Sequence, residues 1–136
     1  MTIKLVYPAL AQILWTFVVL GILFQRRRVA FRNKEVGMAD VAVSTERYPE
    51  RARLAAANYA NQFETPVLFF ALIMLAMEVG ATGTVIVALA WAFVLTRIVH
   101  ALIHTGSNRV PARAAVFALG VVCLFCMAVG IVVTVL

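Results

Sequence analysis

Residues 112–136 read ARAAVFALGVVCLFCMAVGIVVTVL, and this stretch decides the class of the protein. Its only charged residue is Arg113. A helix needs about 20 apolar residues to cross roughly 30 Å of hydrocarbon, so the stretch is long enough to span a membrane. Strands of a membrane barrel would show about 10 residues of alternating polarity, and no such alternation appears. The stretch therefore predicts a transmembrane helix.

Three further long apolar stretches precede it, at about 3–24, 54–77 and 84–103. The 136-residue chain is 64% hydrophobic and 13% charged, and its mean hydropathy is +0.98. A soluble domain is usually about 45–50% apolar and about 25% charged. We therefore predict an all-α integral membrane protein, with residues 1–136 forming a single up-down bundle of four transmembrane helices and the last helix at about 112–136.

Positive charge gathers at one side of this predicted bundle. Ten of the twelve basic residues lie in or beside the first and third connections, and the second connection, at GATGT, has none. The positive-inside rule then places connections one and three in the cytoplasm and both termini outside. The net charge of +6 indicates orientation in the membrane and attraction to anionic lipid head groups. We expect membrane lipid as a partner and no nucleic acid, because no motif for nucleic-acid binding is present.

Polar residues interrupt the second and third apolar stretches. In the second, Asn61 and Glu64 share one helical face, and Pro66 cannot donate a hydrogen bond to the carbonyl of Gln62, so we expect a kink. In the third, Arg97, His100 and His104 follow the i, i+3, i+7 spacing of one face.

Glu64 and Arg97 are predicted to lie at similar depths. At 1.5 Å per residue, Glu64 lies roughly 15 Å and Arg97 roughly 12 Å from the cytoplasmic side. An isolated charge at such depth costs about 3 kcal/mol or more, so such residues normally pair inside the bundle. We predict a Glu64–Arg97 ion pair, completed by Asn61. The pair either only stabilises the contact between the two helices or forms part of a binding site.

Two other constellations favour plain structural roles. His100 and His104 have a spacing that could bind a metal, but no clear third ligand is available apart from Glu64, so we predict no metal site. Cys123 and Cys126 lie in an apolar helix, which favours buried thiols over redox chemistry.

Arg113 is the basic residue best placed for chemistry. It lies just inside the fourth predicted helix, where the helix N-terminus adds partial positive charge. A thiol held there would ionise more readily, because both charges favour the thiolate. The alternative is that Arg113 and the arginines of the first and third connections serve only to orient the chain in the membrane.

Two segments carry a resemblance to a known family. The segment ERARLAAANYANQFETPVLFF resembles the second-helix signature of the MAPEG family, the membrane-associated proteins in eicosanoid and glutathione metabolism, through Asn61, Glu64 and Pro66. The segment RIVHALIHTGSNRVPAR is similar to the prostaglandin E synthase branch. The matching positions are Arg97, His100, Gly106, Arg109, Pro111 and Arg113.

The resemblance implies a homotrimer of four-helix subunits that binds glutathione between subunits near the cytoplasmic face. It implies that Arg113 activates the glutathione thiol, and that lipophilic small molecules are conjugated, reduced or isomerised. The residues expected at the cofactor site are Asn61, Glu64, His100, His104, Arg109, Arg53 and Arg27.

Four positions depart from the family pattern. One is His104, which stands where the eicosanoid enzymes of the family have a Tyr. Ala57 stands where an Arg is usual, and Ala114 and Phe117 replace the Ser and Tyr of the prostaglandin branch. The leading hypothesis is a glutathione-dependent transferase or peroxidase for lipophilic electrophiles in a bacterial-type inner membrane. The alternative is a non-catalytic relative that binds lipid or a small amphiphile without glutathione chemistry. A third reading gives Glu64 and the histidines a role in handling protons or ions.

Overall fold

The structure, a computed structural model, describes residues 3–136, and four crossings in it are long and apolar enough to span a membrane. The helices are α1 (Ile3–Arg32), α2 (Glu50–Ala60), α3 (Thr65–Glu78), α4 (Thr84–Thr105) and α5 (Val110–Val135). The short 3₁₀ helix η2 (Asn61–Phe63) joins α2 and α3 into one crossing, and a second, η1 (Ala39–Val41), lies in the first connection. The described residues form no strand, so the predicted all-α membrane bundle is confirmed.

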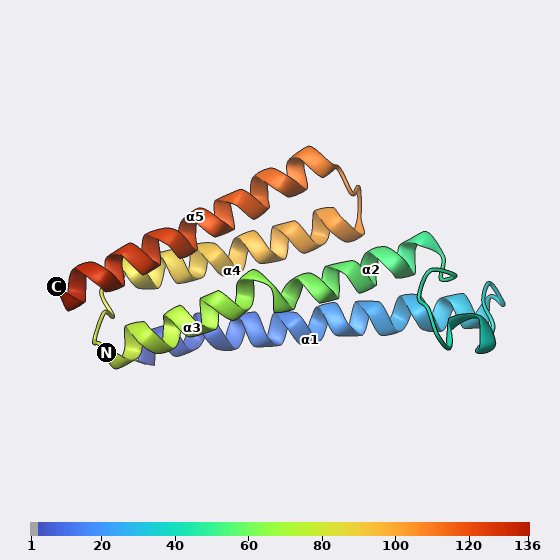
Figure 1. Cartoon of the computed structure of the whole chain (residues 1–136), viewed down its shortest axis with the longest axis horizontal. Helices are drawn as coiled ribbons and strands as arrows, with labels where there is room; N and C mark the ends of the chain where they lie inside the picture. The colour runs from blue at the N-terminus through green and yellow to red at the C-terminus, as the bar shows by residue number, and fades with distance from the viewer. Residues whose placement is uncertain (1–2) are drawn as a thin grey trace.

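The crossings alternate in direction, as predicted. Figure 1 shows α1 alongside α2 and α3, and α4 alongside α5. Both termini lie at one end together with the connection from α3 to α4. The connections at 33–49 and 106–109 lie at the other end, which we call the basic end because the arginine-rich segments gather there.

Helix α1 is longer than the sequence predicted. It continues past the expected end at Phe24 and includes the Arg26–Arg28 run before it stops at Arg32. Arginine is a good helix former, and its long side chain keeps its charge in water while its stem covers apolar surface. The extra residues, Gln25 to Arg32, add about 12 Å at 1.5 Å per residue, so the helix projects beyond its apolar stretch.

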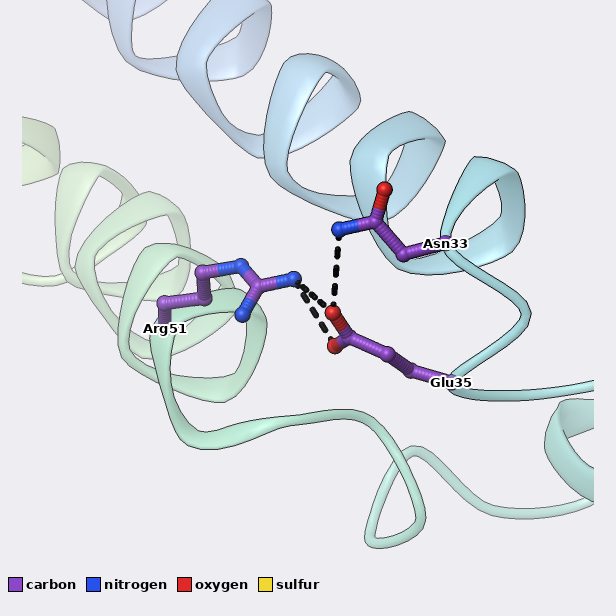
Figure 2. Close-up of polar contacts among 3 residues, drawn as sticks. All are labelled: Asn33, Glu35 and Arg51. Atoms are coloured by element: carbon purple, nitrogen blue, oxygen red, sulfur yellow. Dashed lines mark hydrogen bonds and ion pairs between the residues drawn. The ribbon is translucent and has the colours of Figure 1, made fainter.

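The first connection is held against the end of α1 by a small core and by ion pairs. Ala30, Val36, Tyr48 and Ala52 form a buried cluster. Figure 2 shows Arg51, at the start of α2, donating to both oxygens of Glu35 at 2.6 and 2.8 Å, while Asn33 donates to Oε1 at 3.2 Å. The hydrogen bonds from Arg51 and then Asn33 lower the pKa of Glu35 below its ordinary value.

The second crossing is broken where Pro66 predicted a kink. The α-helix stops at Ala60, a 3₁₀ turn follows, and α3 starts at Thr65 with Pro66 in its first turn. Glu64, between the two, has φ −95° and ψ −101°, outside the helical region. Proline is tolerated in a first helical turn because its missing N–H has no partner there. The predicted kink is confirmed.

Close contact between α4 and α5 depends on glycines. A Cβ at Gly120 would lie 2.8 Å from Oγ1 of Thr96, and one at Gly130 would lie 2.7 Å from Cδ1 of Ile86. Small residues let helices in membranes approach closely. On α5, Cys123 is buried, as predicted, whereas Cys126 is exposed on the outer surface of the bundle.

Candidate functional site

A pocket of about 320 Å³ opens between the α2–α3 break and the α4–α5 pair. Its lining residues are Asn61, Glu64, His100, His104, Arg113, Ala114 and Phe117. Ligand pockets commonly measure about 300–1,000 Å³, so the pocket has the size of a small-molecule site. The structure thus brings together five of the residues that the sequence nominated.

Three separate elements supply these side chains. Asn61 and Glu64 belong to the irregular turn before Pro66, so the break in the second crossing sets their direction. His100 and His104 lie on one face of α4, four residues apart. Arg113 lies in the first turn of α5, where the helix N-terminus carries partial positive charge.

The two histidines differ in their partners. Nδ1 of His104 lies 3.5 Å from the amide nitrogen of Asn61, which donates to it in the tautomer that carries its proton on Nε2. The buried Nδ1 of His100 has no partner within residues 3–136. The His100 ring lies edge-on to the His104 ring, with 5.6 Å between the ring centres. The centre of the Phe117 ring lies 6.0 Å from that of His100. His100 therefore retains one unused hydrogen-bonding atom beside the pocket.

The predicted ion pair between Glu64 and Arg97 is wrong. In the described part of the chain the ion pairs are Arg47–Asp40 and Arg51–Glu35, both at the first connection. Nη2 of Arg97 donates instead to the backbone carbonyl of Asn61 at 3.1 Å. The broken helix offers that carbonyl to Arg97, and the carboxylate of Glu64 is exposed at the pocket.

Arg97 is a buried support of the site and does not line the pocket. It is among the largest side chains that are almost fully buried, and its Nε has no partner among the described residues. Glu64 is near enough to attract it electrostatically without touching it. The bond to Asn61 ties α4 to the break in the second crossing and so helps to fix the pocket wall.

Arg113 has a partner that the sequence did not identify. Its Nη1 donates to Oδ1 of Asn108 at 2.8 Å. Asn108 lies in the connection between α4 and α5 and has a positive φ of 47°. Only the spacing from Gly106 to Pro111 hinted at a tight turn here, and nothing in it pointed to this contact.

Three predicted cofactor residues lie outside the pocket. Arg53 and Arg109 are exposed at the basic end. The guanidinium of Arg27 lies 5.1 Å from the centre of the Tyr48 ring. Arg27 lines a separate cavity of about 210 Å³ together with Tyr59. The fold of the single chain therefore does not bring these three arginines to Arg113.

A second polar contact inside the bundle involves a residue that the sequence reasoning missed. Nε2 of Gln12, fully buried on α1, donates to Oε1 of Gln62 at 3.1 Å. Nε2 of Gln62 donates in turn to the carbonyl of Asn58 at 3.2 Å. A lone Gln in an apolar stretch was the available signal. The contact joins α1 to the same break that forms the pocket.

An apolar cavity lies next to the polar pocket, between α3 and α5. It measures about 420 Å³ and is lined by residues of α3 and α5. Thr65 and Leu68 on its wall follow Glu64, and Val121 lies one helical turn beyond Phe117. The polar pocket therefore lies beside an apolar cavity that suits the apolar part of a lipophilic small molecule.

No group of three or more metal-ligating side chains is found within residues 3–136. His100 and His104 instead form an edge-on pair, with Asn61 close to the second ring. The chemistry available at the pocket is therefore that of one guanidinium, one exposed carboxylate and two imidazoles.

Comparisons with known proteins give a family and no close relative. Neither curated proteins nor solved structures gave a match to the chain. The sequence model of the MAPEG family matches residues 5–133, which is nearly the whole chain. The break at Asn61–Glu64 and the arginine at the start of α5 are the positions on which the resemblance was founded. The chain belongs to the MAPEG family.

Proposed function

We propose that this protein is a membrane-embedded, glutathione-dependent transferase or peroxidase that acts on lipophilic electrophiles. The family includes enzymes of both kinds and uses glutathione as cosubstrate. The observation that carries the proposal is the position of Arg113, which lines one pocket together with Asn61, Glu64, His100 and His104.

The residues of the pocket suit the thiol and the amine of glutathione. When bound, glutathione would supply a thiol, which is nucleophilic as the thiolate and has an ordinary pKa of about 8.5. The charge of Arg113 and the N-terminus of α5 both favour an anion at this place. The exposed carboxylate of Glu64 suits an ammonium group.

The carboxylates of glutathione need cations that one subunit does not supply. Among the described residues that line the pocket, Arg113 is the only Lys or Arg. Arg27, Arg53 and Arg109 belong to the basic end but lie outside this pocket. We propose that a neighbouring subunit of the homotrimer, which the family resemblance implies, brings such arginines to the site.

The lipophilic substrate would reach the thiolate from the bilayer. The apolar cavity between α3 and α5 suits its body, because every side chain on its wall except Thr65 is apolar. In this proposal the membrane is a bacterial inner membrane, with the basic end in the cytoplasm and both termini outside. The spacing of Arg97, His100, Arg109 and Arg113 favours a relative of the prostaglandin E synthase branch.

The test is turnover of a chromogenic aryl chloride with glutathione in detergent. Arg113→Ala should lower kcat by on the order of 100-fold, the usual loss on removing a preorganised electrostatic stabiliser. Arg32→Ala, which removes the same charge from an exposed position at the end of α1, should leave kcat unchanged. Unchanged turnover in Arg113→Ala would reject the proposed role.

A second candidate function is a non-catalytic protein that binds lipid or another small amphiphile. Ala114 and Phe117 favour it, because they line the pocket with apolar surface where hydroxyls stand in the prostaglandin branch. A thermal-shift titration separates the two candidates, since a ligand that binds the folded state raises the apparent stability. No shift with glutathione, together with a shift with a long-chain amphiphile, would favour this second function.

A further inference from the structure

The contact between Asn108 and Arg113 assigns a function to a residue of the connection between α4 and α5. Nη1 of Arg113 donates to the amide oxygen of Asn108 at 2.8 Å, and both side chains are half-buried. We propose that Asn108 is a positioning residue that holds the Arg113 guanidinium at the pocket. This inference rests on the proposed function of Arg113.

The backbone fixes Asn108 before its side chain acts. Its N–H donates to the carbonyl of Ile103 in the last turn of α4 at 2.7 Å. Its φ of 47° lies in the left-handed region, which Asn occupies more readily than most residues other than Gly. The turn is tight, since a Cβ at Gly106 would lie 2.7 Å from the carbonyl oxygen of Leu102. The amide oxygen therefore projects from a constrained point.

A neutral acceptor suits this task better than a carboxylate. An arginine side chain has considerable rotamer freedom, and ordering it in advance removes that entropy loss from ligand binding. The guanidinium has five N–H donors, so one bond to Asn108 leaves the others for an anion. Because an amide carries no charge, it orients Arg113 without neutralising it.

The experiment follows the ultraviolet absorbance of the thiolate as glutathione bound to the purified protein in detergent is titrated with base. Asn108→Gly keeps the positive φ but removes the acceptor, so the titration midpoint should rise by roughly one pH unit, a tenfold change in ionisation. Lys34→Gly is the matched control, because Lys34 also has a positive φ, 58°, and lies at the first connection. It should leave the midpoint unchanged.

A second pair of variants tests the contact by charge. Asn108→Asp keeps an acceptor and places a negative charge against the guanidinium, so it should also raise the midpoint. Ser107→Asp adds the same charge one residue away, at an exposed position, and should raise it less. This pair also carries the test if Asn108→Gly fails to fold.

The outcomes separate this inference from the proposed function. Wild-type midpoints in Asn108→Gly and Asn108→Asp, with a raised midpoint in Arg113→Ala, would overturn the role of Asn108 alone. A wild-type midpoint in Arg113→Ala would overturn the role of Arg113 itself. Equal shifts in Asn108→Asp and Ser107→Asp would show a general charge effect and would also reject the positioning role.

Discussion

Gly120 offers a sharp test of how α4 and α5 pack. The Cβ of an alanine there would lie 2.8 Å from Oγ1 of Thr96, closer than real Cβ contacts allow. Thr96 cannot simply turn away, because its hydroxyl is buried and donates to the carbonyl of Phe93 at 2.6 Å. Gly120→Ala therefore forces either a shift of the helices or the loss of that hydrogen bond.

The expected size follows from two opposing effects. Replacing Gly by Ala in a helix usually stabilises it by about 1 kcal/mol. Overpacking a tight contact costs about 1–3 kcal/mol. We expect Gly120→Ala to change the free energy of unfolding by about 0–2 kcal/mol in the destabilising direction. Gly21→Ala is the control, because a Cβ on Gly21 in α1 would meet nothing within 4 Å.

The assay is unfolding in mixed detergent micelles, followed by helical circular dichroism. Gly21→Ala should be as stable as the wild type or more stable, and Gly120→Ala should lie about 0–2 kcal/mol below the wild type. Adding Thr96→Ala should relieve Gly120→Ala, because the remaining neighbour, Phe93, is at an ordinary 3.7 Å. Equal stability of the two glycine variants would refute the packing described for α4 and α5.

Three further predictions concern the pocket and the first connection. Glu64→Gln should change the free energy of unfolding by less than about 1 kcal/mol in the same assay, because Glu64 forms no ion pair with any of residues 3–136; a buried pair would lose about 3–5 kcal/mol. Pro66→Ala supplies an N–H that favours a continuous helix, so the glutathione-dependent thermal shift should fall while the helical signal persists. Because the pKa of Glu35 is lowered from 4.5, its contribution to stability is complete above that pH and is lost as the pH falls through the lower folded value. Proteolysis of the 33–49 connection should therefore begin on acidification, and at a higher pH in Arg51→Gln.

The fold could be predicted because each crossing is a long apolar stretch, and such a stretch can adopt few structures other than a transmembrane helix. Within a bilayer, backbone groups must pair inside the segment, so apolar runs of this length become helices. The ends of the helices were harder to predict, as α1 shows. Residues 25–32 are polar enough to suggest a connection, but arginine favours a helix once the preceding turns exist.

The residues of the pocket could be predicted because helical spacing fixes which side chains share a face. His100 and His104 on α4 reach the pocket for this reason. Asn108 could not be found in the same way, because its contact depends on the backbone path between two helices. Gln12 was missed because its partner, Gln62, lies fifty positions away on another crossing.

The failure of the predicted ion pair follows from the break that was itself predicted. Depth along an ideal helix placed Glu64 and Arg97 at one level, and that reasoning assumed a regular face through residue 64. Pro66 ends this regularity, and the 3₁₀ turn presents the carbonyl of Asn61 to Arg97. A backbone oxygen satisfies part of the guanidinium without using the carboxylate. Glu64 is thereby left exposed in the pocket wall, so the same break that prevents the predicted ion pair places a carboxylate at the pocket.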